Sequence, residues 1–232
     1  IFQNISFNLK SSEILGIAGV EGNGQREIVE AIIGIQDYES GSIKLKNTAI
    51  DDLSIRERLN LGISFIPEDR QAQALIMDMS LTNNVILGRQ SLEKYKTKMT
   101  TVNLSNATKA SESVIENFDV KTPNTGTIAT ALSGGNQQKY VVGSELEDNQ
   151  TLLIASQPTR GIDIGAQALI WEKLRKTRDD GLGVLLISAD LEELIGLSDR
   201  IVVVYQGQFV AELKPEEITP EILGSYMTGL MK

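Results

Sequence analysis

A glycine-rich turn between an apolar run and an amphipathic segment constrains the fold of this chain more than any other stretch. The apolar run covers residues 14–18, the turn covers 19–26, and residues 28–33 have the apolar spacing of a helix. A buried strand, a glycine loop and a helix in this order form the setting of a phosphate-binding P-loop. The sequence therefore predicts an α/β fold built around such a loop.

Two positions of this loop depart from the P-loop pattern G-x-x-x-x-G-K-[ST]. Gln25 occupies the place of the lysine, and Arg26 occupies the place of the hydroxyl residue that binds Mg²⁺. The pattern indicates the frame of a nucleotide site whose catalytic side chains have been replaced. The candidate nucleotide-binding residues are Gly19, Gly22, Asn23, Gly24, Gln25 and Arg26.

Composition excludes several other classes of protein. The 232 residues contain no cysteine and no histidine, which removes disulfides and the sites that bind metal through these two residue types. A net charge of −9 disfavours a surface for the nucleic-acid backbone, because such surfaces are usually basic. No apolar run reaches the roughly 18 residues of a membrane span. Because the chain starts inside a predicted strand, we expect it to be part of a longer polypeptide.

Alternating strands and helices at both ends of the chain predict a parallel sheet covered by helices. Ser54 and Asp190 each precede a glutamate by three residues, as in a capping box, and Gly34 is placed to end the first helix. The predicted strands are 1–10, 14–18, 42–45, 62–66, 152–155, 184–187, 201–205 and 208–213, and the first and third are expected to form a small antiparallel sheet. The helices expected among them are 28–33, 54–61, 165–178, one that starts at Asp190, and 219–230.

Helical patterns dominate the middle of the chain, at residues 81–87, 107–118 and 137–146. Residues 94–106 carry little that could be buried, and we expect a mobile surface connection there. The predicted architecture is one domain over 1–232. It has an α/β core at about 1–70 and 151–213, an inserted helical subdomain at about 71–150 and a C-terminal helix at about 219–230.

A second motif narrows the interpretation. Residues 132–139 read LSGGNQQK, so that a serine and two glycines open a helix. Backbone N–H groups at a helix N-terminus bind anions, and the serine hydroxyl adds a donor. This octet, about a hundred residues after the glycine loop, resembles the signature sequence of ATP-binding-cassette (ABC) ATPases.

Further stretches match the landmarks of that family in order. Glu68 stands in a Q-loop region (66–70) where the family has glutamine, and Ser156 and Gln157 replace the Asp-Glu pair of the Walker B strand. Asp163 matches the D-loop, and Ala189 stands in the switch region where the family has histidine. The aromatic A-loop residue of the family would lie before the first residue.

The residues of these stretches are similar to those in the second, C-terminal half of the tandem ATP-binding subunits of bacterial carbohydrate and nucleoside importers. Within that group, the nucleoside branch is closest. The resemblance implies partners: the N-terminal nucleotide-binding domain of the same subunit, transmembrane permease subunits, and indirectly a solute-binding protein. It also implies a peripheral location at the cytoplasmic face of the plasma membrane. The transported solute is not implied, since substrate choice lies in other parts of such a machine.

The substitutions at Gln25, Arg26, Glu68, Ser156, Gln157 and Ala189 leave no intact catalytic residue, and no metal site is expected in this chain. A neutral amide replaces the P-loop ammonium, and Gln157 cannot accept a proton from an attacking water. The isolated domain is therefore expected not to hydrolyse ATP. In the family that the chain resembles, ATP lies between one domain's P-loop and the other's signature sequence. The resemblance thus implies a composite site in which Ser133, Gly134, Gly135 and Gln137 contact ATP held by the partner domain, with Mg²⁺ only there, while Asp163 couples the two sites.

Two other functions remain open at this point. The first is a regulatory module that binds nucleotide without metal, and the second is a cytosolic ABC protein that acts on ribosomes or DNA. The close-set apolar residues Leu75, Ile76, Met77, Met79 and Leu81 either receive a membrane subunit or pack in the core of the helical subdomain.

Overall fold

The computed structural model describes residues 2–98, 101–147 and 150–231, and the chain forms two compact units. The sheet unit lies within Ile1–Phe65, Thr151–Gln157 and Lys173–Lys232. The helical unit comprises Ile66–Gln150 and Pro158–Glu172.

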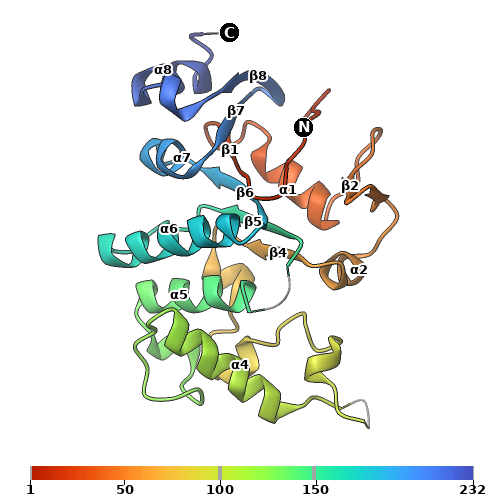
Figure 1. Cartoon of the computed structure of the whole chain (residues 1–232), viewed down its shortest axis with the longest axis vertical. Coiled ribbons are helices and arrows are strands. Elements are labelled where there is room, and N and C mark those ends of the chain that lie inside the picture. The colour runs from red at the N-terminus through yellow and green to blue at the C-terminus, as the bar shows by residue number, and fades with distance from the viewer. Residues whose placement is uncertain (1, 99–100, 148–149, 232) are drawn as a thin grey trace. The chain divides into compact units, whose positions relative to one another are not determined.

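A six-stranded sheet with the order β4-β5-β6-β1-β7-β8 forms the centre of the sheet unit (Figure 1). Strand β1 is paired in parallel with β6 on one side and β7 on the other, and β5 is parallel to β6. Strand β8 runs antiparallel to β7, with which it forms a hairpin. The strands are β1 (Ile14–Ala18), β4 (Ile63–Ile66), β5 (Leu152–Ser156), β6 (Gly183–Ser188), β7 (Arg200–Tyr205) and β8 (Gln208–Leu213).

The predicted strand–loop–helix is confirmed, and it occupies the centre of this sheet. All five residues of β1 are buried, and the glycine loop follows it directly into α1 (Gln25–Ile33). Gly34 ends α1 with a φ of 84°, a conformation that favours glycine, and its N–H donates to the carbonyl oxygens of Glu30 and Ala31. The apolar face of α1 packs into the core that β1, β6 and β7 also form. This packing fixes the loop at the end of a buried strand.

A buried arginine joins α1 to α2 (Ile55–Asn60). Arg58 is 4% exposed, and its Nη1 atom donates to the carbonyl oxygens of Ala31 (2.7 Å) and Ile32 (2.8 Å). The last carbonyls of a helix have no partner inside it, so the guanidinium supplies what α1 lacks. The predicted cap of α2 is also confirmed, because Ser54 and Glu57 form a reciprocal capping box.

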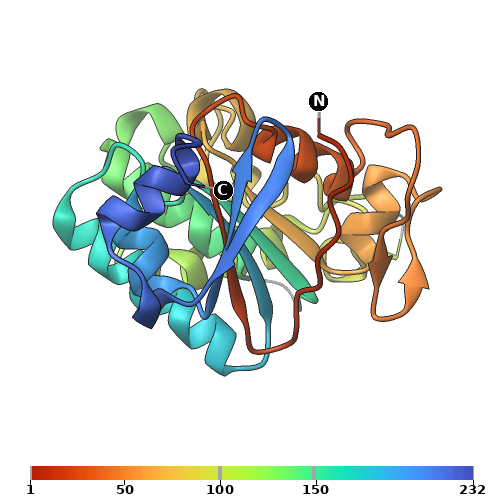
Figure 2. The ribbon, with the colours of Figure 1, turned by 90° about the horizontal axis from the view of Figure 1, so that it is seen from above.

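The predicted strand over residues 1–10 is wrong for the described residues 2–10, which adopt no regular strand. The alternation itself is present, since Ile5, Phe7 and Leu9 are half-buried while their neighbours are exposed. The segment runs beside the β7–β8 hairpin in Figure 2, where Gln3 N–H donates to the Gly207 carbonyl oxygen at 2.8 Å. Apolar spacing predicted which side chains pack inward, but it could not predict whether a strand edge was free to pair.

The small antiparallel sheet exists in a reduced form. It consists of β2 (Lys44–Leu45) and β3 (Thr48–Ala49), without the segment at the start of the chain. The remaining helices of the sheet unit begin at predicted caps. Asp190 accepts two backbone N–H bonds at the start of α7 (Leu191–Leu197), and Thr219 caps α8 (Pro220–Met227).

The helical unit is built on the packing of α4 (Leu104–Asn117) against α5 (Gly134–Glu145), with the shorter α3 (Leu81–Asn84) beside α4. A side chain at Gly143 would start 2.7 Å from Val114 and 2.8 Å from Phe118, so the two helices approach closely there. The buried Tyr140 hydroxyl donates to the Leu81 carbonyl oxygen at 2.7 Å, and burial raises the pKa of Tyr140. Helix α6 (Ile164–Asp179) begins in this unit.

The connection predicted as a mobile surface segment over residues 94–106 contains more order than expected. Tyr95 is 1% exposed within the short 3-10 helix Glu93–Tyr95, and Lys96 and Val102 form an isolated β-bridge. Residues 99 and 100 lie outside the described residues. The buried Tyr95 side chain anchors part of a segment whose polar composition predicted a loop.

The apolar cluster after the Q-loop region divides between core and surface. Leu75 and Leu81 are buried, whereas Ile76 and Met79 are 44% and 40% exposed.

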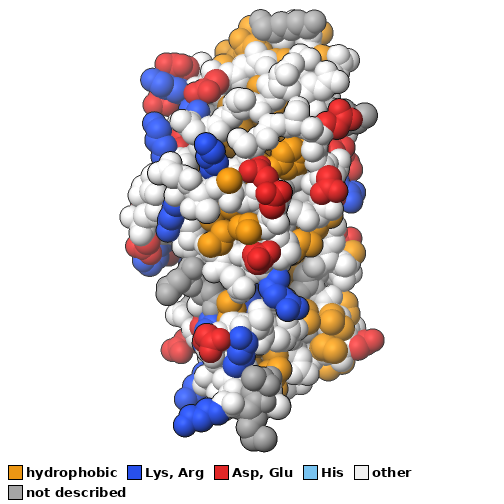
Figure 3. All heavy atoms as spheres, turned by 90° about the vertical axis from the view of Figure 1, so that its right-hand side faces the viewer, with side chains coloured by type: hydrophobic (Ala, Val, Ile, Leu, Met, Phe, Trp, Pro, Cys, Tyr) orange, Lys and Arg blue, Asp and Glu red, His pale blue; other side chains and the backbone are white. Residues whose placement is uncertain are grey.

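Acidic and basic side chains are interspersed over the face of the molecule in Figure 3. None of the described helices combines the length and the apolar character needed to cross a membrane.

Candidate functional site

The side chain at the P-loop lysine position folds back onto its own loop. Gln25 is 8% exposed, and its Nε2 atom donates to the Val20 carbonyl oxygen at 3.2 Å. A side chain at Gly19 would start 2.1 Å from this Nε2 atom, so the amide lies directly against the first glycine of the loop. The Gln25 amide is thus hydrogen-bonded to the backbone of its own loop.

The neighbouring cation points away from the loop. The Arg26 Nε atom donates to Glu30 Oε1 at 2.7 Å, an (i, i+4) ion pair on the surface of α1. The hydrogen bond and the charge of Glu30 raise the pKa of Arg26. Arg26 therefore offers neither a hydroxyl for a metal nor a cation directed at the loop.

Asn23 joins the glycine loop to the β7–β8 hairpin. Its side-chain oxygen accepts from Gln206 N–H, and its carbonyl oxygen accepts from Gly207 N–H, both at 2.9 Å. Gln206 and Gly207 form a two-residue turn with φ values of 49° and 75°, the conformation that hairpins of this length favour. Sequence reasoning predicted a turn at Gly207 but did not connect either residue to the glycine loop, because nothing local along the chain links them to it.

The two residues at the Walker B and switch positions bond to each other. Gln157 has a φ of 49°, which is uncommon for a residue other than glycine, and its N–H donates to the Ile187 carbonyl oxygen at 2.7 Å. Its Oε1 atom accepts from Ala189 N–H at 3.2 Å. Ser156, at the end of β5, pairs in register with Ile187 of β6.

These residues do not fit a magnesium ion at this chain's own loop. Mg²⁺ prefers carboxylate and water oxygens in octahedral geometry. Gln25 and Gln157 carry neutral amides that already bond within the unit, and Arg26 provides no oxygen ligand. The geometry instead describes a loop closed by its own polar side chains.

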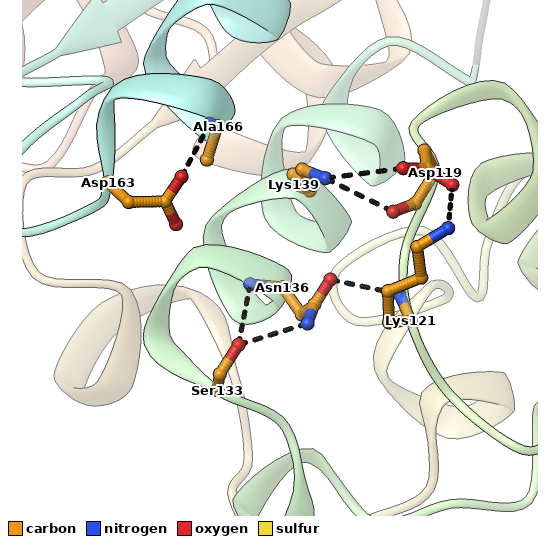
Figure 4. Close-up of polar contacts among 7 residues, drawn as sticks. All are labelled: Asp119, Lys121, Ser133, Asn136, Lys139, Asp163 and Ala166. Atoms are coloured by element: carbon orange, nitrogen blue, oxygen red, sulfur yellow. Dashed lines mark hydrogen bonds and ion pairs between the residues drawn. The ribbon is translucent and has the colours of Figure 1, made fainter.

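The second motif, in the helical unit, has an exposed start. Ser133 is exposed, and its Oγ atom caps α5 by accepting from Asn136 N–H at 3.5 Å and from Asn136 Nδ2 at 3.0 Å (Figure 4). The Asn136 Oδ1 atom accepts from Lys121 N–H at 2.9 Å, and the Lys139 Nζ atom donates to the Asp119 carbonyl oxygen at 3.2 Å. Asn136 and Lys139 therefore tie α5 to the 119–121 segment.

The two glutamines of the octet are buried. Gln137 is 3% exposed; its Nε2 atom donates to the carbonyl oxygens of Ala129 and Leu132, and its Oε1 atom accepts from Gln71 at 3.1 Å. Gln138 donates to the Pro158 carbonyl oxygen at 2.7 Å. A direct contact of Gln137 with a nucleotide would require it to give up bonds that hold the start of α5.

Polar residues from the D-loop surround the two glycines that open α5. A side chain at Gly135 would start 3.0 Å from Asp163 Oδ2. The other carboxylate oxygen of Asp163 accepts from Ala166 N–H at 2.9 Å, and this bond lowers the pKa of Asp163 (Figure 4). Glu68 forms an ion pair with Arg160, which connects the Q-loop region to the D-loop. The helical unit thus brings three of the predicted landmarks together.

Comparisons with known proteins agree with this geometry. A family model described as "ABC transporter" matches residues 2–160. The chain is 42% identical over 227 residues to the guanosine import ATP-binding protein NupO of Bacillus subtilis (strain 168), in an alignment that covers 98% of this chain and 44% of that protein. It is 38% identical over 224 residues to the ribose import ATP-binding protein RbsA of Clostridium tetani (strain Massachusetts / E88), which covers 97% and 44% respectively. The chain therefore spans less than half the length of these relatives.

Solved structures give the same fold. The dimeric structure of a post-hydrolysis state of the ATP-binding cassette MJ0796 bound to ADP and Pi superimposes with a TM-score of 0.78 at 22% identity. The superposition covers 92% of this chain and 90% of that chain. A nucleotide-free ATP-binding cassette from an ABC transporter superimposes with a TM-score of 0.79 at 18% identity, covering 97% of this chain and 92% of that chain.

Proposed function

Because the chain belongs to the ABC transporter family, we propose that it is a nucleotide-binding domain of the ATP-binding subunit of a nucleoside or sugar importer. In this proposal it is the C-terminal of two tandem domains, and its own P-loop is degenerate. It contributes the segment 132–139 to the ATP site of the N-terminal domain, which holds ATP and Mg²⁺. The subunit would lie at the cytoplasmic face of the plasma membrane against the permease subunits, which receive solute from a binding protein.

The contrast between the two motifs carries this proposal. The polar side chains of the chain's own loop are bonded inside the sheet unit, as Gln25 and Gln157 are. At the start of α5, by contrast, Ser133 is exposed and the two glycines that follow it carry no side chain of their own over the first turn. Exposed N–H groups at a helix start favour a phosphate.

Two further observations support the head-to-tail arrangement. Ile164, directly after Asp163, is 84% exposed, and a large apolar side chain in this state suits a surface that a partner covers. The match to NupO also leaves more than half of that relative outside the alignment, which is room for a second cassette. The name of that relative motivates the choice of a nucleoside as the first solute to test.

The substitution Gly134→Asp in the complete importer tests the proposal. The carboxylate would repel the terminal phosphate of ATP held by the partner domain, whereas a negative charge in the first turn of a helix favours folding. Only the flexible end of Arg70 must move to make room, because its Nη2 atom lies 2.7 Å from the position where the new side chain would start. We expect solute uptake and solute-stimulated ATP hydrolysis to be lost while the unfolding temperature stays within a few degrees of the original.

Gly224→Asp is the matched control, since it places the same carboxylate on a helical glycine with open space around it. Uptake should be unchanged in this variant. Normal uptake in both variants would refute the role of the signature segment.

The degenerate loop is tested on the chain alone. The purified chain should hydrolyse ATP no faster than a sample from which it has been removed by immunoprecipitation. Turnover that follows the chain through purification would contradict the assignment of an inactive loop.

A further inference from the structure

One arginine beside the start of α5 has no role in the assignments above. Arg70 is the first residue of a π-helical turn, Arg70–Ala74, and it belongs to the helical unit with α5. Asp69 caps this turn by accepting from the N–H groups of Gln71 and Ala72 at 3.0 and 3.1 Å. The backbone that carries Arg70 is therefore held by local hydrogen bonds.

The guanidinium of Arg70 lies between the D-loop and the signature helix. Its Nη1 atom donates to the Arg160 carbonyl oxygen at 3.2 Å. Its Nη2 atom lies 2.7 Å from the position where a side chain at Gly134 would start. Because position 134 is a glycine, the guanidinium can rest against the first turn of α5, next to the backbone N–H groups there.

Most of the hydrogen-bonding capacity of Arg70 is unused. Its Nε atom is buried without an acceptor, and among the described residues no carboxylate pairs with its charge. Arg160, by comparison, pairs with Glu68. A guanidinium can donate five hydrogen bonds, and a buried donor without a partner is rare in folded proteins. The side chain thus brings an uncompensated positive charge to a place where the neighbouring donors are neutral.

We propose that Arg70 is a second, cationic contact for the terminal phosphate of the ATP molecule that faces the signature helix. This inference rests on the proposed function, since the ATP belongs to the partner domain. Arginine suits a phosphate because its planar group donates two parallel bonds and keeps its charge at all physiological pH values. The bond to the Arg160 carbonyl oxygen orients the guanidinium before the ATP arrives.

Three variants of the complete importer separate charge from structure. Arg70→Lys keeps a cation, whereas Arg70→Gln keeps a donor for the Arg160 carbonyl oxygen but carries no charge. Arg56→Met removes an exposed cation of the sheet unit, outside the helical unit that carries Arg70 and the signature helix. The steady-state kcat and KM for ATP are measured for each variant, together with its unfolding temperature.

We expect Arg70→Gln to lower kcat/KM for ATP about 10- to 100-fold, the loss typical of a hydrogen bond to a charged group, with most of the change in KM. Arg70→Lys should retain a substantial part of the activity, and Arg56→Met should equal the original protein. Equal effects of Arg70→Lys and Arg70→Gln would overturn the proposal, because the charge would then not matter. So would an Arg70→Gln variant as active as Arg56→Met.

The outcome for Gly134→Asp distinguishes a failure of the Arg70 contact from a failure of the proposed function. If Gly134→Asp abolishes uptake while Arg70→Gln has no effect, the signature segment contacts ATP without help from Arg70. If both variants are fully active, the proposed function itself fails. Only a loss in both, with partial rescue by Arg70→Lys, supports Arg70 as the phosphate contact.

Discussion

Placing a lysine at position 25 is the most direct test of what the Gln25 amide does in the glycine loop. In the wild-type chain the Gln25 amide donates to the Val20 carbonyl oxygen at 3.2 Å and lies against Gly19. The substitution Gln25→Lys exchanges this neutral bond for an ammonium of similar reach. The loop glycines and the rest of α1 are untouched, so the frame for phosphate remains in place.

The expected gain follows from the two bonds exchanged. A neutral hydrogen bond contributes about 0.5–1.5 kcal/mol net, and a bond to a charged group contributes about 1.5–3 kcal/mol. Because the bond to Val20 is present in the free chain, its loss does not weaken ATP binding, and the bond gained to phosphate corresponds to roughly a 10- to 100-fold lower Kd for ATP. Hydrolysis should not appear, because Gln157 still bonds to Ala189 N–H and provides no general base.

Calorimetric titration of the purified chain with ATP, with and without Mg²⁺, measures this change. Gln25→Met is the matched control, since it has similar length but can neither bond to Val20 nor attract phosphate. We expect tighter binding only for Gln25→Lys, with the same affinity in both metal conditions. An affinity unchanged by the lysine would refute the view that the loop retains a frame for phosphate, and measurable turnover would refute the view that the Walker B substitutions prevent catalysis.

Three other predictions concern contacts inside the sheet unit. Arg58→Met should lower the free energy of unfolding by about 1–3 kcal/mol, the cost of leaving buried carbonyl acceptors without a donor, and a urea midpoint equal to wild type would contradict the role of this guanidinium. The hydrogen bond from Tyr38 lowers the pKa of Asp51. Its stabilising effect is therefore present above the ordinary carboxyl pKa of about 4 and is lost as pH falls through the lower folded value. Acid unfolding monitored by circular dichroism should become less steep in Asp51→Asn than in the wild-type chain. Identical acid-unfolding curves for the two proteins would exclude the effect. Gln157→Ala should speed hydrogen exchange at the amide of Ala189, whereas Gln157→Glu should preserve its protection, and equal exchange in both would show that this bond is not formed in solution.

Local sequence signals determined the start, the end and the type of most elements. Ser54, Asp190 and Thr219 cap helices where their side chains can reach a backbone N–H two or three residues ahead. Gly34 ends α1 because only a few residue types tolerate a positive φ. These effects act within four residues, so they can be read from the chain alone. The apolar run before the glycine loop likewise predicted the fully buried β1.

The same local signals failed where a partner strand or a single anchor decided the outcome. The alternating segment at the start of the chain packs its apolar side chains as predicted but forms no strand in its described part. Tyr95 orders a segment whose composition predicted a loop. In both places the result depends on which edge or cavity the rest of the fold leaves available.

The sequence by itself determined that this chain is an ABC-type α/β protein with altered residues at its own P-loop and an unaltered signature segment. Only the tertiary structure decided what the altered residues do: Asn23 bonds to Gln206 across 183 residues, and Gln157 bonds to Ala189 across 32. It also placed the unpaired Arg70 against Gly134. Such contacts depend on which loops the fold brings to the same place, and no property of a residue's neighbours along the chain carries that information.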